Sequence, residues 1–194
     1  MRIVLQGVFR RTAETLGASL RHHQPCFGRN ELAEANPLVH LGMALAESGF
    51  FVYAQCPLHG KRYPRVDLVA LTRRNGFVVE AKRLHAGQGA GWMVGDWDRL
   101  GRVPLRVRAP PHRKPTLVYR AIMATTQSKA IGEWWASRGR PRTPGRSRGR
   151  SELGWLDLGR ALRSAGDVDA LPLEDDSHML LYAFGPRERP LFAG

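Results

Sequence analysis

The chain contains only two cysteines, Cys26 and Cys56, among its 194 residues. Two cysteines cannot build the multi-disulfide framework of a small secreted domain, so we expect a reducing, cytoplasmic setting. Long hydrophobic runs are also missing, because the apolar stretch from Ile3 to Val8 is interrupted by a glutamine and a glycine. That stretch is too short for a signal-peptide core or a membrane span. The sequence therefore predicts a soluble protein with no membrane partner.

Acidic residues are scarce. The chain has 17 aspartates and glutamates against 30 lysines and arginines, which gives a formal net charge of +13 and a sequence pI of about 11.1. Net charge does not determine a fold, but an excess of this size favours polyanionic partners, of which we expect nucleic acid, and DNA first. A biased amino-acid usage is the alternative explanation, because 26 of the 30 basic residues are arginine. Whether the chain acts alone or as a homodimer stays open.

The residue pattern predicts an α/β (α+β) fold with a central mixed β-sheet flanked by helices. The expected helices cover residues 12–21, 30–47, 95–102, 128–137 and 152–164. The expected strands cover residues 3–9, 50–55, 66–71, 77–82, 116–125 and 178–184. Hydrophobic residues make up 43% of the chain, which is enough for one core. We place that core in residues 1–137, followed by an arginine-rich flexible arm at 138–150 and a helix–strand extension at 151–194 that packs on it.

A carboxylate heads the apolar stripe of the helix expected over residues 30–47. Asn30 is a candidate N-cap, and Pro37 either kinks this helix or starts a second one. The stripe consists of Glu34, Leu38, Leu41 and Leu45, spaced at i, i+4, i+7 and i+11. Glu34 should therefore point toward the sheet. Glu31 lies on a neighbouring stripe and is the second choice for an acid that faces the sheet.

The stretch with the strongest chemical signal is RVDLVALTRRNGFVVEAKRL, residues 65–84. Glu80 and Lys82 are two apart on an expected strand, so both project from one face. Asp67 is an acid near the start of the preceding strand. A hairpin loop with an even number of residues places Asp67 on the same face as Glu80 and Lys82.

The position of that hairpin loop decides how close the two acids lie. A loop centred between Arg73 and Arg74 puts Asp67 opposite Glu80. A tight turn at the Asn-Gly dipeptide of residues 75–76 would instead pair Asp67 with Leu84, about 13 Å away from Glu80 along the strand. A site at Asp67 and Glu80 therefore predicts a loop longer than this dipeptide, with its glycine in a left-handed conformation.

Two converging carboxylates need a cation, and oxygen ligands in a site that handles phosphate suit Mg²⁺ or Mn²⁺. Asp67, Glu80 and the backbone carbonyl of Ala81 are the expected ligands. The metal would polarise a phosphate and lower the pKa of a bound water, and Lys82 would orient that water.

These residues give the sequence a resemblance to the PD-(D/E)XK, restriction-endonuclease-like nuclease superfamily. Asp67 lies thirteen residues before Glu80-Ala81-Lys82, which matches the E-X-K half of the motif. The order helix, three strands, helix, strand over residues 30–135 is similar to that family's core. The residue before Asp67 is Val66 instead of proline. The resemblance implies a Mg²⁺-dependent endonuclease that hydrolyses phosphodiesters, and it implies that Glu34 is a further acid of the site.

Basic segments supply the expected nucleic-acid contacts. We interpret most of the stretch from Arg99 to Arg120, which has seven basic residues, four prolines and no acid, as a loop. The arm at 138–150 has six arginines among prolines and glycines. The candidate contact residues are Arg83, Gln88, Arg106, Arg108, Arg113, Lys114, Arg138, Arg140, Arg142, Arg146, Arg148 and Arg150.

Other interpretations stay open. Asp67, Glu80 and Lys82 could be a solvated face of surface ion pairs. The chain could be a catalytically inactive nucleic-acid-binding module, or a basic structural component of a larger nucleoprotein assembly.

The tryptophans at 92, 97, 134 and 135 could stack on bases, although core packing is the commoner role of tryptophans near helices. The acids at 96 and 98 could join the site, but we expect them to supply charge at a helix N-terminus. The pairs His23–Cys26 and Cys56–His59 have zinc-ligand spacing, but we do not expect a structural Zn²⁺, since one imidazole and one thiolate per pair is an unusual ligand set.

Overall fold

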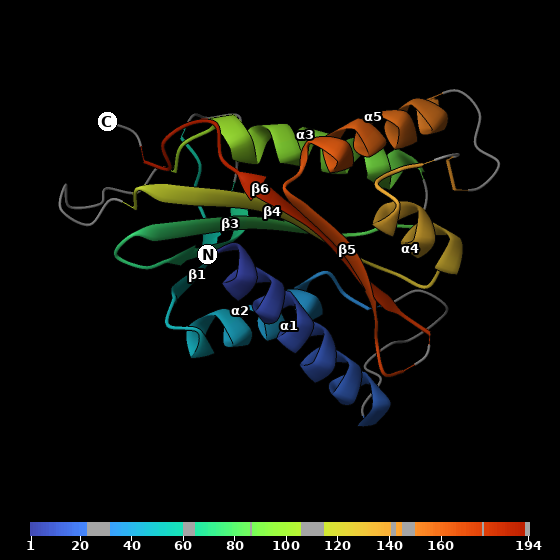
Figure 1. The fold of residues 1–194 in the computed structure, drawn as a ribbon, viewed down its shortest axis with the longest axis horizontal. Helices are drawn as coiled ribbons and strands as arrows, with labels where there is room; N and C mark the ends of the chain where they lie inside the picture. The colour runs from blue at the N-terminus through green and yellow to red at the C-terminus, as the bar shows by residue number, and fades with distance from the viewer. Residues whose placement is uncertain are drawn as a thin grey trace.

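Six strands form one mixed β-sheet in the order β1-β2-β3-β4-β6-β5 (Figure 1). The structure, a computed structural model of the chain, describes residues 1–22, 32–59, 65–85, 87–105, 115–140, 143–144, 150–175 and 177–192. The strands are β1 (Phe51–Cys56), β2 (Val66–Leu71), β3 (Asn75–Arg83), β4 (Leu117–Thr126), β5 (Asp167–Pro172) and β6 (Met179–Pro186). The helices are α1 (Arg2–His22), α2 (Ala35–Glu47), α3 (Gly87–Arg102), α4 (Lys129–Ala136) and α5 (Arg150–Ser164). Among the pairings of these six strands, β3–β4 is parallel and the others are antiparallel. The mixed α/β class with helices flanking a sheet is therefore confirmed.

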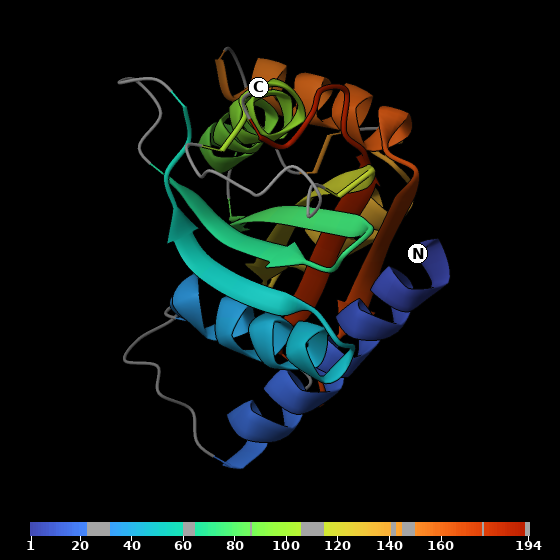
Figure 2. The same ribbon diagram turned by 90° about the vertical axis from the view of Figure 1, so that its left-hand side faces the viewer.

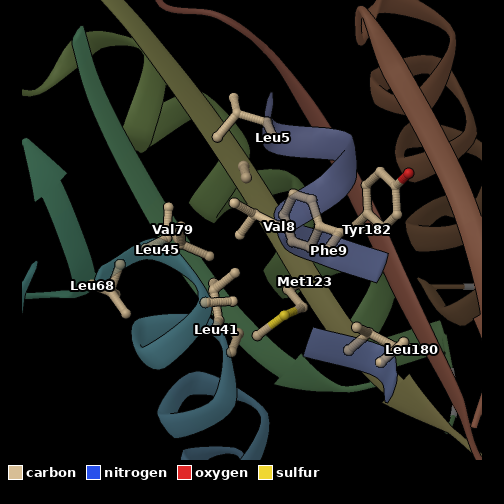
Figure 3. Close-up of a cluster of buried hydrophobic side chains, with 14 of the residues drawn as sticks. Leu5, Val8, Phe9, Leu41, Leu45, Leu68, Val79, Met123, Leu180 and Tyr182 are labelled. Carbon is tan, nitrogen blue, oxygen red and sulfur yellow. The ribbon is translucent and has the colours of Figure 1, made fainter. Parts of the chain in front are cut away.

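The helices form a layer on each face of the sheet (Figures 1 and 2). Helices α1 and α2 cover one face, and α3, α4 and α5 cover the other. The core on the α1/α2 side is drawn in Figure 3, where Phe9 of α1 stacks on Tyr182 of β6 with ring centroids 4.1 Å apart. Leu41 and Leu45 of α2 pack against Leu68 and other strand residues in the same cluster. Both faces of the sheet are thus closed by apolar contacts, and any polar site must lie where that packing is interrupted.

The N-terminal segment is helical throughout, so the prediction of a strand at residues 3–9 is wrong. The buried residues of α1 include Leu5, Phe9, Leu16 and Leu20, which recur at helical spacing. Ile3 is β-branched and so prefers strands, but its side chain is 82% exposed and adds little packing to either structure. The apolar stripe of a long helix overrides the local preference of a few residues.

The β2–β3 hairpin turns at Arg73 and Arg74. Thr72 and Asn75 close the turn through a backbone hydrogen bond of 2.8 Å, and Leu68 pairs with Val79 in the register expected from a loop centred between the two arginines. The loop is nevertheless no longer than a dipeptide. The expectation that Gly76 adopts a left-handed conformation is wrong as well, because Gly76 lies inside β3 and its φ is not positive. A Cβ at Gly76 would lie 3.1–3.3 Å from Leu191, Pro115 and Val118, so this glycine permits close packing instead of a turn.

Helix α2 begins at Ala35, with Glu34 at its N-cap position. The expected start at Asn30 lies outside the described residues. Pro37 is buried in the first turn of α2, where a missing N–H costs no hydrogen bond, so it does not kink the helix. The start of α2 at Ala35 is two residues from the alternative of a helix that begins at this proline.

Helix α3 is longer than expected at its N-terminal end, because it begins at Gly87 instead of residue 95, and it ends at Arg102 as expected. Arg99 and Arg120, at the two ends of the stretch interpreted mostly as a basic loop, lie in the expected helix and the expected strand. Arg120 is buried in β4, where its guanidinium lies 4.2 Å from the Trp97 ring centroid and donates to the Trp97 carbonyl at 2.9 Å. It also pairs with Glu188 at 3.0 Å. Arg120 thus fastens α3 to the sheet.

The C-terminal residues belong to the same sheet as the rest. Strand β6 pairs with β4, and β5, which the sequence did not reveal, forms the edge beyond β6. Arg138 is not part of a free arm, because its guanidinium donates to the Ala165 carbonyl at 3.0 Å and its own carbonyl accepts from Arg163 at 3.3 Å. These contacts join the end of α4 to the end of α5.

Candidate active site

The three residues singled out on the hairpin share one face of the sheet. Leu68 and Val79 point into the cluster under α1 and α2, so Asp67, Glu80 and Lys82, which alternate with them, project toward the α3 side. Continuing the Leu68–Val79 register by one residue brings Asp67 across from Glu80. The same-face placement expected from strand parity is confirmed.

The β2–β3 ladder ends beside Asp67, and the strand backbone there bonds to its side chain. The Ala81 amide donates to the Asp67 carboxylate at 2.9 Å, and Gln55 donates to its other oxygen at 3.2 Å. Gln55 has a φ of 53°, which puts an irregular residue of β1 beside the site. The N–H and C=O of one strand residue point to the same side, so the Ala81 carbonyl also faces β2 and Asp67. The carboxylates of Asp67 and Glu80 and the carbonyl of Ala81 therefore converge where the β2–β3 ladder ends.

Glu80 is buried, with a side chain only 4% exposed. Burial, a hydrogen bond with Asp67 and the negative charges of Asp67 and Asp96 raise its pKa to about 8, and they outweigh the guanidinium of Arg99, which lowers it. Glu80 nevertheless pairs with Arg99 through one oxygen and lies 3.7 Å from Lys82 through the other. Both oxygens of the central carboxylate thus face cations of the chain itself.

Asp96 and Arg99 of α3 complete the cluster, and neither was expected to be central to it. Asp96 lies 3.6 Å from the Lys82 ammonium and 2.7 Å from the Arg99 guanidinium. Its pKa is raised by burial, against the lowering effect of Lys82 and Arg99. Burial lowers the pKa of Lys82, but the attraction of Asp96, Glu80, Asp67 and Glu34 outweighs it and the pKa is raised. Lys82 is accordingly a charged donor held between two acids.

The expected role of Asp96 at a helix N-terminus is wrong, because α3 begins nine residues earlier, at Gly87. The spacing of Asp96 and Arg99, one helical turn apart, was the available signal. The glycine-rich start of α3 obscured this signal, because glycine is a poor helix former and the helix was therefore expected to begin only at residue 95.

Glu34 reaches the site from the edge of the sheet. Its carboxylate accepts a hydrogen bond of 3.1 Å from the Arg83 amide, at the end of the strand that carries Glu80 and Lys82. Glu31 lies outside the described residues, and Glu47 pairs with Arg11 at 3.8 Å, at the other end of α2. Glu34 is therefore the described acid of this helix region that approaches the cluster.

The candidate nucleic-acid contacts are placed only in part. Arg83 is exposed at the end of β3, and Arg140 is exposed beyond α4. Gln88 and Arg150 lie in the first turns of α3 and α5. The other arm and loop residues, Arg106, Arg108, Arg113, Lys114, Arg142, Arg146 and Arg148, lie outside the described residues.

No group of three or more His, Cys, Asp or Glu side chains in the described part of the chain is arranged to hold a metal ion. The candidate ligands are instead two carboxylates and a backbone carbonyl, and Mg²⁺ often takes only one or two carboxylates and completes its shell with water and substrate phosphate. Of the zinc-spaced residues, Cys56 is buried and its thiol pKa is raised by burial, and His59 is exposed. His23 and Cys26 lie outside the described residues.

Comparisons with known proteins give no match, either to a family model, to a curated protein or to a solved structure. None of the helices in the described segments is long and apolar enough to cross a membrane.

Proposed function

We propose that this chain is a metal-dependent nuclease that hydrolyses phosphodiester bonds of DNA. The observation that supports this best is the convergence of Asp67, Glu80 and Lys82 on one face, where the Ala81 amide bonds to Asp67 and the β2–β3 ladder ends. Surface ion pairs do not explain this arrangement, because the Glu80 side chain is 4% exposed. A buried carboxylate such as Glu80 is costly unless it is paired or binds a cation.

The order α2, β1, β2, β3, α3, β4 adds support, since it follows the helix, three-strand, helix, strand order of the PD-(D/E)XK nucleases that the sequence resembles. The formal net charge of +13 suits a polyanionic substrate.

Asp67, Glu80 and the Ala81 carbonyl would hold Mg²⁺ or Mn²⁺. When bound, the cation would polarise the scissile phosphate and lower the pKa of a water that attacks it. Lys82, held between Glu80 and Asp96, can donate to that water and to the developing negative charge on the phosphate. Glu34 adds negative charge at the end of the strand and holds the Arg83 amide.

The test is a cleavage assay across single-stranded, duplex and branched DNA and RNA, with Mg²⁺ or Mn²⁺ and with a chelator. Lys82→Ala should lower the cleavage rate at least about 100-fold, the usual effect of removing one group that stabilises transition-state charge. Lys129→Ala is the matched control, because its side chain is 88% exposed and lies outside the cluster.

The pairing of both Glu80 oxygens with Arg99 and Lys82 supports a second candidate, a binding module without catalysis. In that case the wild-type chain binds nucleic acid but cleaves none of the substrates with either metal.

A further inference from the structure

Trp92 on α3 differs from the other tryptophans in its exposure. All five tryptophans lie in described segments, and Trp97, Trp134, Trp135 and Trp155 are at most 4% exposed. Trp92 is 60% exposed. The buried positions of the same turn are filled by Ala90 and Met93. The indole therefore contributes little to the core and is accessible to a ligand.

Trp92 lies on the same stripe of α3 as the two helix residues of the candidate active site. Asp96 is four residues and Arg99 seven residues further on, so all three occupy one face of the helix. The rise of an α-helix puts Trp92 about 6 Å from Asp96 along the helix axis. Because Asp96 and Arg99 touch Lys82 and Glu80, the stripe leads from the candidate catalytic cluster to the exposed indole.

A groove runs along the same part of α3. It is lined by Gly95, Asp96, Asp98, Arg99, Arg102 and Val103, with a volume of about 420 Å³. That volume falls in the range of small-ligand sites and is large enough for a nucleotide unit. Gly95, the first lining residue along α3, lies one helical turn after Trp92, which is not itself part of the lining. Arg99 is the cation at the inner wall of this groove, where its guanidinium pairs with Asp96 and Glu80 and its side chain keeps 17% exposure.

We propose that the α3 stripe binds a nucleic-acid strand, with an unpaired base stacked on Trp92 and an adjoining phosphate on Arg99. An indole stacks on any base because every base has a π-face, whereas a guanidinium suits phosphate. The faces of paired bases inside a duplex are covered by their neighbours, so only a single strand, a flap or a frayed end can reach the indole. The preferred substrate therefore has an unpaired base beside the scissile phosphate. This inference rests on the proposed nuclease site, but strand binding can be measured without cleavage.

The test measures binding of the full chain in a chelator, so that no cleavage occurs. Three fluorescent probes of equal length are compared by anisotropy, namely an oligothymidylate, an abasic strand with the same phosphates, and a blunt duplex. Trp92→Ala should weaken oligothymidylate binding about 5- to 150-fold, the range for removal of one stacked base. It should leave binding of the abasic strand unchanged, and Trp92→Phe should retain most of the affinity. Phe51→Ala is the matched control, because this aromatic on β1 is 70% exposed and lies at the turn end of the sheet, away from the site.

The inference is overturned if Trp92→Ala binds oligothymidylate as well as wild type, or if it weakens the abasic strand equally. Equal wild-type affinity for the oligothymidylate and the abasic strand would also overturn it. If Trp92→Ala loses oligothymidylate binding selectively while the wild type cleaves nothing with Mg²⁺ or Mn²⁺, the stacking surface stands and the nuclease proposal fails.

Discussion

At the scale of single residues, the protonation of Glu80 links metal binding to pH. Burial and the neighbouring acids raise its pKa to about 8, so the protonated form of Glu80 is favoured at pH 7 in the absence of metal. A metal ligand must be deprotonated, so a bound cation should expel that proton.

We predict that Mg²⁺ or Mn²⁺ binding at pH 7 releases roughly one proton and that metal affinity rises as the pH rises through about 8. Calorimetry in two buffers of different protonation enthalpy measures the released proton. Glu80→Gln is the control and should release none. Equal apparent binding enthalpies for the wild type in both buffers would contradict the prediction.

The same group affects the stability of the metal-free fold. The pKa of Glu80 is raised from 4.5 to about 8 by folding, so its protonated form stabilises the fold fully below pH 4.5, and this contribution is lost as the pH rises through 8. We therefore predict that Glu80→Gln, which cannot ionise, loses less stability between pH 5 and pH 9 than the wild type. Urea unfolding in a chelator at the two pH values measures the difference. Parallel decreases in both proteins would show that Glu80 does not set the dependence.

Arg99 occupies an oxygen of Glu80 that a cation would use. Lys82 lies on the same strand as Glu80 and therefore stays beside it. Arg99 lies on α3, where it also pairs with Asp96, and it can keep this second ion pair when a cation displaces it from Glu80. We predict that Arg99→Ala binds Mg²⁺ about tenfold more tightly at pH 9, equivalent to about 1.4 kcal/mol, because Arg99 no longer competes with the metal for Glu80. The variant should nevertheless cleave more slowly, because Arg99 is also the proposed ligand of the phosphate. Metal titration and the cleavage rate are measured together. Arg102→Ala, one turn further on α3, should leave metal affinity unchanged, and weaker metal binding by Arg99→Ala would show that the arginine supports the metal site.

At the scale of elements, α3 positions half of the site, and its own position depends on α5. A Cβ at Gly154 of α5 would lie 2.5 Å from the Gly87 carbonyl oxygen and 3.0 Å from the Gly91 amide nitrogen. The two helices can therefore approach this closely only with glycine at 154. The buried Arg120 fastens α3 to β4 independently.

We predict that Gly154→Ala lowers the free energy of unfolding by about 1–3 kcal/mol, since overpacking forces the helices apart. The cleavage rate should fall by more than the loss of folded protein explains, because the Asp96 and Arg99 side chains move with α3. Gly7→Ala is the matched control: it lies within α1 with no atom within 4 Å of the added Cβ, and it should raise stability by about 0.5–1 kcal/mol. Urea unfolding of both variants is the measurement, and equal stabilities would contradict the packing argument.

The elements also show what could be predicted from sequence. Asp67, Glu80 and Lys82 could be placed on one face because strand parity depends only on counting residues. Asp96 and Arg99 could not, because their contacts with the strand depend on how α3 crosses the sheet. Strand β5 was missed since Asp167 and Asp169 interrupt its apolar pattern, yet Asp167 accepts from Arg2 and Gln6 of α1. That tertiary contact leaves no local trace.

At the scale of the whole molecule, the excess of positive charge predicts salt-dependent binding of nucleic acid. Arg138 is engaged between α4 and α5, so the binding contribution of the arginine-rich segment is expected from Arg142, Arg146 and Arg148. Replacing these three by serine should flatten the dependence of log affinity on log salt by about 0.7–0.9 for each phosphate that the segment no longer neutralises. Thermal stability should not change. Serine at the exposed Arg11 and Arg21 of α1 is the control, and an unchanged slope in the triple variant would assign phosphate binding to other residues.

The two-residue turn of the β2–β3 hairpin constrains how insertions and deletions can alter this protein. If the turn stays a dipeptide, one residue added between Thr72 and Asn75 shifts the partner of Asp67 by one and, with β3 fixed by β4, moves its carboxylate to the face packed by α1 and α2. Adding two residues between Arg73 and Arg74 can instead extend each strand by one residue and leave Asp67 opposite Glu80. Single-residue insertions at this exposed turn, normally the most tolerant place in a sheet, are therefore expected to be selected against in related chains that retain the site.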